Sequence, residues 1–293
     1  MDRKRLVILG ATGQIGRIIS NNLLNDPDLH LILQSRSERP GYHKWNPDEG
    51  TAGLTQLLEN SDVVLNLIGK IPSPGVTKHD FQRVNVKLAV KILETARRAG
   101  VPKIFMTSTA AVYGRPISPE KPFKENSILS PLSEYGKSKV AMEKELGKIS
   151  GADLSTLRIG NVAGADALLG QFVDMRQIKE ITLDRFQDGK GPNRSYIGPK
   201  RLSETIKRLA ISLNEIPTCL NVTSWPPTAM EDMLISLDQR RPGSIRQKWR
   251  AADSSAIQNV SLSHELLLDT LGDAIPPVNS DDIITEFLAQ KWD

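Results

Sequence analysis

Residues 6–16 read LVILGATGQIG, a run of four large apolar residues followed by glycines at positions 10, 13 and 16. A short, continuously apolar run of this kind is typical of a strand buried on both faces. Directly after it, apolar side chains recur three and four residues apart, which indicates an amphipathic helix, at Ile15, Ile18, Ile19 and Leu23. The stretch therefore predicts a strand, a tight glycine turn and a helix.

The three glycines have distinct physical tasks in such a turn. Gly10 permits the sharp change of direction, Gly13 lets the backbone come close to a phosphate, and Gly16 lets the helix pack on the strand. The beginning of the helix presents free N–H groups and the positive end of its dipole to an anion. We therefore predict a cradle for a dinucleotide pyrophosphate, formed by Gly10, Gly13 and Gly16 together with Thr12, Gln14 and Ile15.

The pattern of strand and helix repeats along the first half of the chain. Further apolar runs occur at residues 29–33, 63–68, 104–106 and 154–157, with helical patterns between them. Buried strands that alternate with helices predict an α/β fold with a doubly wound parallel sheet, that is, a Rossmann fold. The second half is less regular. We predict a dinucleotide-binding domain over residues 1–163 and a smaller substrate lobe over residues 164–293, some segments of which return to the sheet.

The end of the second predicted strand, residues 33–37, reads LQSRS and contains no acidic residue. A carboxylate at this point would hold the ribose hydroxyls of NAD. Arg36 can instead pair with a 2′-phosphate, and Ser35 can donate a hydrogen bond to it. The cofactor is therefore predicted to be NADP or NAD, with NADP favoured.

A second informative stretch is YGKSK at residues 135–139. Tyr135 and Lys139 lie one helical turn apart, so their side chains share one face. A free phenol has a pKa of about 10, and a neighbouring ammonium favours the phenolate, which would bring this pKa closer to working pH. Lys139 can also hold the cofactor ribose. Hydroxyl groups at the end of the preceding strand, in TSTAAVYG at 107–114, can donate to a substrate oxygen.

Together these residues resemble those of an extended short-chain dehydrogenase/reductase, specifically the NAD-dependent epimerase/dehydratase family with its UDP-galactose 4-epimerase-like enzymes. The resemblance covers roughly residues 1–225. It implies that Thr109, Tyr135 and Lys139 are catalytic, with Ser108 as a second, substrate-contacting hydroxyl. It also implies that Leu67 and Gly69, in NLIG at 66–69, line the cofactor.

Two later segments suggest the class of substrate. The segment LRIGNVAG at 157–164 is similar to the one in which a family asparagine, here Asn161, touches a nucleotide-sugar diphosphate. The segment DGKGPNRSYI at 188–197 is similar to the one whose arginine, here Arg194, contacts the same phosphates. Dehydratases of the family carry an Asp-Glu pair after the catalytic threonine, where this chain has Ala110-Ala111, so the resemblance does not extend to dehydration.

The sequence leaves several functional alternatives open. The resemblance favours epimerisation, whereas the missing acidic residue favours net reduction with NADPH. Reduction of a carbonyl that is not part of a sugar, and a non-catalytic NAD(P)-binding sensor or scaffold, are the other readings. Family members commonly form homodimers by pairing two helices, here near residues 84–98 and 133–149, and the sequence permits this.

Composition and charge narrow the class of protein. The chain has 293 residues and a net charge of +4, which suits an anionic small ligand and does not call for nucleic acid. No apolar run approaches the ~20 residues of a membrane span, and no signal peptide is evident. The scattered histidines and the single cysteine suggest no metal site. We expect a cytoplasmic protein.

Overall fold

The computed structural model describes residues 2–118, 120–149, 151, 153–174, 177–272 and 276–292. It divides into two compact units. Unit 1 comprises residues 1–114, 128–158 and 203–220, and unit 2 comprises residues 115–127, 159–202 and 221–293. The chain thus crosses between the units several times. The predicted boundary at residue 163 lies close to the crossing at 158/159, and residues 203–220 are the part of the second half that belongs to unit 1.

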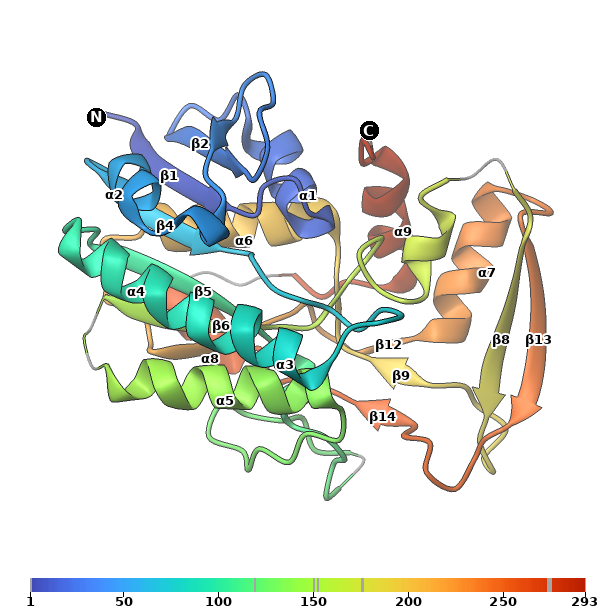
Figure 1. The fold of residues 1–293 in the computed structure, drawn as a ribbon. Coiled ribbons are helices and arrows are strands. Elements are labelled where there is room, and N and C mark those ends of the chain that lie inside the picture. Colours follow the sequence, from blue (N-terminus) through green and yellow to red (C-terminus); the bar gives the residue numbers. More distant parts are fainter. Residues whose placement is uncertain are drawn as a thin grey trace. The chain divides into compact units, whose positions relative to one another are not determined.

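A seven-stranded sheet forms the centre of unit 1, in the order β11-β6-β5-β4-β1-β2-β3 (Figure 1). The pairs β1–β2, β1–β4, β4–β5 and β2–β3 are parallel. This confirms the predicted doubly wound α/β fold. The strands are β1 Lys4–Leu9, β2 Leu29–Ser35, β3 His43–Lys44, β4 Val63–Asn66, β5 Lys103–Thr109, β6 Leu154–Ile159 and β11 Cys219–Val222.

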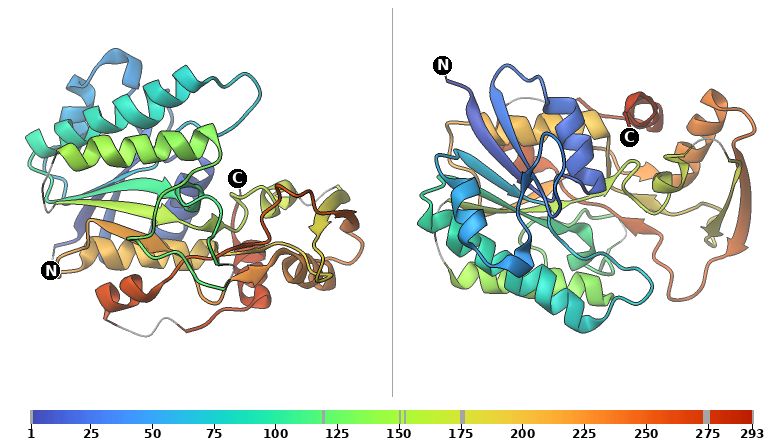
Figure 2. Two further views of the ribbon diagram at one scale, coloured as in Figure 1. Left: turned by 90° about the horizontal axis from the view of Figure 1, so that it is seen from below. Right: turned by 45° about the horizontal axis from the view of Figure 1, so that its top comes forward.

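Helices cover both faces of this sheet, with α4 and α5 on the face opposite to α6 (Figures 1 and 2). The central strands are continuously apolar because both of their faces are buried. One core layer joins α2, α4 and α5 to the sheet through buried side chains that include Leu57, Ile92 and Met142. The helices are α1 Gln14–Leu23, α2 Ala52–Leu58, α3 Lys78–Phe81, α4 Ala89–Arg98, α5 Glu134–Lys148 and α6 Pro199–Ile211.

Three shorter turns also belong to unit 1: the 3₁₀ turns η1 Pro47–Glu49 and η3 Ala110–Val112, and the π-helical segment η2 Gln82–Leu88. The sequence pattern predicted a regular helix through residues 84–96, but the structure widens its first part into η2 before α4 begins. Wide turns of this kind are rare and recur at functional sites. Here the wide turn contains Asn85, which is 1% exposed.

Unit 2 has its own apolar core, in which Phe172, Leu234 and Phe287 are buried. It contains a parallel pair β8–β13, a second pair β7–β10 and a small sheet β12-β9-β14. Its elements are β7 Asn161–Val162, η4 Leu169–Phe172, β8 Lys179–Arg185, β9 Asn193–Arg194, β10 Tyr196–Ile197, β12 Thr228–Ala229, α7 Met230–Arg240, β13 Ile245–Ala251, β14 Asn259–Val260, α8 Glu265–Leu271 and α9 Ser280–Ala289.

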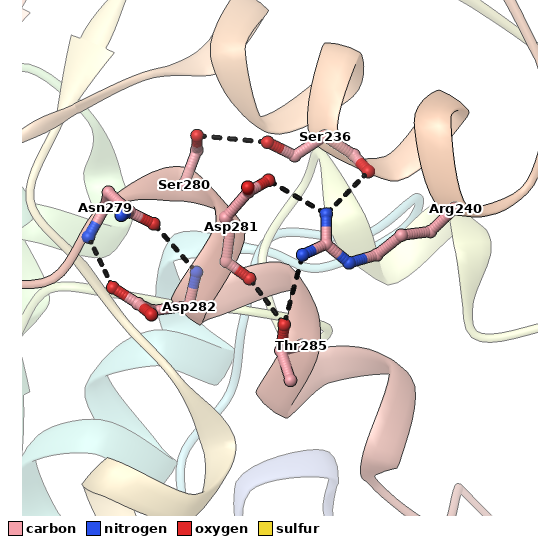
Figure 3. A network of polar contacts seen from close by, with 7 residues as sticks. All are labelled: Ser236, Arg240, Asn279, Ser280, Asp281, Asp282 and Thr285. Atoms are coloured by element: carbon pink, nitrogen blue, oxygen red, sulfur yellow. Dashed lines mark hydrogen bonds and ion pairs between the residues drawn. The ribbon is translucent and has the colours of Figure 1, made fainter.

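The last helix of unit 2 is fixed at its beginning by polar contacts (Figure 3). Asn279 and Asp282 form a reciprocal capping box, which satisfies two N–H groups that the helix itself leaves without partners. Arg240 of α7 donates to Asp281 at 2.8 Å, close to the positive end of the helix dipole that favours this carboxylate. These contacts join α9 to α7.

No helix among the described residues is long and apolar enough to cross a membrane.

Candidate active site

The glycine turn has the predicted geometry. Gly10 adopts a left-handed conformation with φ of +78°, which side chains disfavour. A Cβ atom at Gly16 would lie 2.5 Å from the carbonyl oxygen of Gly10, so helix α1 and the turn meet at a distance that only glycine permits. Gly13 precedes α1 and contributes no side-chain cap. The first N–H groups of α1 therefore remain available to an anion, as a pyrophosphate cradle requires.

A cavity of about 320 Å³ opens beside this turn within unit 1. Six of the predicted cofactor residues line it, namely Gly10, Thr12, Gly13, Arg36, Leu67 and Gly69. The predicted residues Gln14, Ile15, Gly16, Ser35 and Lys139 are not part of its lining. A turn that a Cβ would fill, an uncapped helix and an adjacent cavity fit a dinucleotide.

Ser35 and Arg36, at the end of β2, have different surroundings. Ser35 is 3% exposed, and its hydroxyl accepts from the backbone N–H of Ser37 at 3.4 Å. Arg36 is exposed and lines the cavity, and no hydrogen bond or ion pair involves it in the described part of the chain. Its guanidinium is thus free to meet a phosphate, whereas the Ser35 side chain is turned toward its own loop.

The sequence did not predict several of the residues that line this cavity, because folding brings segments that are distant in the chain to one edge of the sheet. Gln34 accepts from the N–H of Gly10 at 2.8 Å and donates to the carbonyl of Trp45, which joins the glycine turn to the loop after β3. That loop adds Asp48 to the lining, paired with Arg83 of η2 at 3.2 Å. Parallel strands place their carboxyl ends at one edge of the sheet, so a prediction that β1, β2 and β3 are adjacent would have placed these residues together. The unpredicted lining residues include Gln34, Asn46, Pro47, Asp48, Lys70 and Arg83.

The three predicted catalytic residues come together where β5 meets α5. Thr109 ends β5, and its hydroxyl is close enough to the phenol of Tyr135, near the beginning of α5, to influence the pKa of that phenol. One turn further along, the Lys139 amine donates to the carbonyl of Thr107 at 2.8 Å. A Cβ atom at Gly69, one of the cavity residues, would lie 3.5 Å from the same amine. The phenol and the amine thus share one face of α5, the Thr109 hydroxyl faces them from β5, and the amine lies next to the cavity residue Gly69.

Burial governs the ionisation of both predicted catalytic groups on α5. It lowers the pKa of Lys139 to about 8, although the negative charge of Glu143 opposes this shift. Burial also raises the pKa of Tyr135, and the nearby hydroxyl of Thr109 offsets this only in part. Our expectation that Lys139 would lower the phenol's pKa is therefore wrong for the chain by itself. The Lys139 amine donates to the carbonyl of Thr107, and burial of the phenol is the largest influence on the pKa of Tyr135.

Asn85 connects the cavity wall to the catalytic helix. Its amide oxygen accepts from the N–H of Lys70 at 2.6 Å, and its amide nitrogen donates to the Lys70 carbonyl and to the hydroxyl of Ser138. Ser138 in turn donates to the carbonyl of Tyr135 at 2.7 Å. The wide turn in η2 places this buried amide so that it fixes the loop before α3 and the first turns of α5 together.

Residues 6–197 match the model of the NAD dependent epimerase/dehydratase family. The chain belongs to this family. The resemblance inferred from the sequence is thereby confirmed. A UDP-glucose 4-epimerase of Azospirillum brasilense is 32% identical over 176 residues, 55% of this chain and 50% of that protein. A dTDP-6-deoxy-L-talose 4-dehydrogenase (NAD(P)(+)) of Kitasatospora kifunensis is also 32% identical over 176 residues, 55% of this chain and 53% of that protein.

The chain spans about half the length of these curated relatives. Solved structures match over most of the chain and show the fold. The UDP-glucose 4-epimerase of Brucella ovis, in complex with NAD, superposes with a TM-score of 0.82 at 18% identity, covering 97% of both chains. The UDP-glucuronic acid 4-epimerase of Bacillus cereus, in complex with UDP-glucuronic acid and NAD, gives 0.77 at 18% identity and covers 97% of this chain and 98% of that one.

The predicted substrate residues of this family member have partners of their own. Ser108 donates to Glu143 at 2.5 Å, within a buried cluster of unit 1. In unit 2, Asn161 lies beside Tyr196, whose hydroxyl donates to Asp166 at 2.9 Å. Arg194 donates to the carbonyls of Asn193, Ile257 and Gln258. Its Nε makes no hydrogen bond in the described ranges, so this side chain keeps a donor for a ligand.

A second cavity, of about 620 Å³, lies within unit 2 at the ends of β8 and β13. An aromatic ring and a cation meet at its wall, because the guanidinium of Arg185 lies 4.2 Å from the ring centre of Trp249. Phe186 and Arg250 add a second ring and a second cation. No motif in the sequence identified Arg185 or Phe186, whose place beside Trp249 and Arg250 depends on the pairing of two strands about 65 residues apart in the chain.

Proposed function

We propose that this protein is an NAD(P)-dependent oxidoreductase or epimerase that acts on a secondary alcohol or ketone of a nucleotide-linked sugar. The meeting of Thr109, Tyr135 and Lys139 beside the glycine-turn cavity is the single observation that carries the proposal. A bound nicotinamide would supply the hydride acceptor or donor. The protein's own residues would place the substrate oxygen and move its proton.

Each catalytic residue has a defined task in this proposal. The phenol of Tyr135 exchanges a proton with the substrate oxygen, because a phenol, with an ordinary pKa of about 10, gives up its proton far more readily than an aliphatic hydroxyl such as that of Thr109. The hydroxyl of Thr109, which lies close to that phenol, orients the same oxygen. Lys139 holds positive charge near the phenol and would bind the cofactor ribose, together with the turn at Gly10 and Gly13, which would hold the pyrophosphate.

Two net reactions share this machinery. If the cofactor stays bound and the hydride returns to the opposite face, the result is epimerisation, and if the cofactor exchanges, the result is reduction. The nucleotides released when purified protein is denatured can be identified by mass. Tightly held oxidised cofactor supports an epimerase, and an empty protein that captures NADPH supports a reductase. Failure to bind either dinucleotide refutes the whole proposal.

The cofactor is proposed to be NADP rather than NAD, because the exposed guanidinium of Arg36 lines the cavity and no carboxylate stands beside it at the end of β2. We expect Arg36→Ala to weaken NADPH binding about tenfold and to leave NADH binding almost unchanged, since a charge-assisted hydrogen bond contributes about 1.5–3 kcal/mol. Fluorescence titration measures both affinities. Arg39→Ala is the control, because Arg39 lies over the ring of Tyr42 and not in the cavity lining. NADH binding as tight as NADPH in the unchanged protein would contradict this preference.

The substrate is proposed to be a nucleotide sugar, with Asn161 and Arg194 toward its diphosphate. The unit 2 cavity, with the rings of Phe186 and Trp249 and the cation of Arg250, suits a base and its phosphates and supports this class. We expect Arg194→Ala and Asn161→Ala each to raise KM for a nucleotide sugar about tenfold.

Because Arg194 also holds three carbonyls, thermal unfolding must be recorded beside the kinetics. Arg246→Ala, an exposed cation of β13 outside the cavity lining, is the control. A KM that does not change in either variant, with folding intact, removes the nucleotide-sugar assignment and leaves a different carbonyl substrate.

Dimer formation stays a prediction. The outward side chains of α4 and α5 are charged rather than apolar in the structure, and include Lys91, Glu94, Lys137 and Lys144.

A further inference from the structure

Three consecutive residues of β5 are each joined to a different turn of α5. The carbonyl of Thr107 accepts from Lys139, and the Thr109 hydroxyl lies close to the phenol of Tyr135. Between them, the hydroxyl of Ser108 donates to Glu143 at 2.5 Å. Tyr135, Lys139 and Glu143 are spaced by four residues, so they share one face of the helix. The contact of Ser108 with Glu143 therefore lies on the same helix face as the contacts of Tyr135 and Lys139, the two proposed catalytic residues.

Glu143 is held from the other side by β6, the neighbour of β5 in the sheet. Arg158 donates to its two carboxylate oxygens through Nε at 3.2 Å and Nη2 at 2.7 Å. The side chains of Arg158 and Glu143 are only 7% and 11% exposed. Nη1 of Arg158 donates to the hydroxyl of the buried Tyr113 at 2.9 Å, and the guanidinium lies over that ring. The carboxylate is thus fixed in position.

A buried ion pair of this kind is a weak source of stability, because desolvation of the two charges offsets most of their attraction. What the pair does supply is a fixed negative charge one helical turn from the catalytic amine. The backbones also approach closely here, since a Cβ atom at Gly136 would lie 2.6 Å from the carbonyl oxygen of Ala111. Small displacements of β5 against α5 would therefore separate Thr109 from Tyr135.

We propose that Glu143 is a positioning residue of the active site. Its carboxylate, fixed by Arg158, holds the end of β5 against α5 through Ser108 and maintains the charge of the Lys139 amine. The proposal rests on the proposed function and deepens it, because it assigns a task to a residue that touches neither cofactor nor substrate. It also reassigns Ser108 from the substrate to this contact.

Charged and titratable groups near the amine of Lys139 come from its own helix and from the neighbouring strand β6. Its own helix contributes Tyr135 and Glu143, and β6 contributes Arg158 through the ion pair. On the side toward η2, the described residues next to the amine include Gly69 and the uncharged amide of Asn85, and Lys70 is exposed. Glu143 is the group whose field raises the pKa of Lys139, which burial lowers to about 8.

Two substitutions at the ion pair should move the pKa of Lys139 in opposite directions. In Glu143→Gln the negative charge is lost, so the amine gives up its proton more readily and its pKa falls by about one unit. In Arg158→Gln a competing cation is lost and the carboxylate acts on the amine alone, so the pKa rises. A purely structural contact would not produce shifts of opposite sign.

The measurement is an NMR titration of ¹³C-labelled lysine in the purified protein without cofactor or substrate. The signal that disappears in Lys139→Met identifies the residue. Glu145→Gln is the matched control, because Glu145 carries the same charge on the same helix but pairs with the exposed Lys148. The alkaline limb of the pH profile of kcat/KM should move with the NMR value. Identical titration of Lys139 in the unchanged protein and in both ion-pair variants would overturn the proposal.

If Glu143→Gln does not fold, Ser108→Ala tests the mechanical part, because it removes the link to β5 and keeps every charge. We expect kcat to fall about tenfold while cofactor affinity and the Lys139 titration stay unchanged; an unchanged kcat would overturn the positioning role. The NMR titration needs no substrate, so it can succeed where no turnover is found. In that case the proposed function fails and the electrostatic assignment stands.

Discussion

Tyr135→Phe is expected to lower turnover about 1,000-fold while cofactor affinity stays within a factor of two. The substitution removes only the phenol oxygen, which is the proposed proton donor and acceptor, and general acid–base groups contribute about 100- to 10,000-fold to rate. The remaining ring keeps its packing against Phe81, whose ring centre lies 6.2 Å away. Steady-state kinetics with a nucleotide sugar and fluorescence titration with the dinucleotide measure the two quantities separately.

Tyr42→Phe is the control for that experiment, since the Tyr42 side chain contacts Arg39 and lies outside both cavities. Turnover that survives in Tyr135→Phe would leave the non-catalytic sensor or scaffold as the better interpretation. The raised pKa of Tyr135 also indicates in which direction the proton would move. The phenol holds its proton throughout neutral pH in the chain by itself, so it is prepared to donate a proton to a carbonyl.

Gly16→Ala is expected to disrupt both folding and cofactor binding. The added Cβ would lie 2.5 Å from the carbonyl oxygen of Gly10 and 2.6 Å from the Cα of Ala11, and backbone atoms cannot rotate out of the way. Overpacking of this kind costs about 1–3 kcal/mol in free energy of unfolding. The helix must also move away from the turn that would hold the pyrophosphate, so dinucleotide affinity should fall at least about tenfold.

Gly147→Ala provides the matched comparison. Gly147 is also a helical glycine, near the end of α5, but nothing lies within 4 Å of its Cβ position. The same substitution should there be neutral or stabilise the protein by up to about 1 kcal/mol, because alanine favours the helix. Urea denaturation compares the two variants. A Gly16→Ala protein as stable as Gly147→Ala, with full cofactor affinity, would show that the turn does not hold the dinucleotide as proposed.

Local sequence carried much information about unit 1. The apolar run at residues 6–9 and the glycines that follow specify a buried strand, a tight turn and an uncapped helix, because each depends on neighbours a few residues away. The spacing of Tyr135 and Lys139 likewise predicts that they share a helix face. These inferences succeed because strand alternation, helical period and the conformational freedom of glycine are local properties of the chain.

Other features could not be read in this way. The pairing of Asp48 with Arg83, and that of Glu143 with Arg158, require strands and helices to be placed first. The same holds for the Arg194 side chain, because two of its carbonyl partners, Ile257 and Gln258, lie more than sixty residues further along the chain. Ser108 is the clearest case, since the sequence offers it as a second hydroxyl for the substrate and only the neighbouring helix shows that its hydroxyl donates a hydrogen bond to Glu143.

The amino-acid sequence by itself thus determined the glycine turn, the helix face that Tyr135 and Lys139 share, and the family. Tertiary structure alone decided how these two groups ionise. In water, an ammonium one turn from a phenol would favour the phenolate and lower the pKa of the phenol. In the folded chain, desolvation raises the pKa of Tyr135 and lowers that of Lys139, and the carboxylate of Glu143, held by Arg158 of β6, opposes the second shift. Burial and long-range charge depend on everything that surrounds a group, and no local pattern records them.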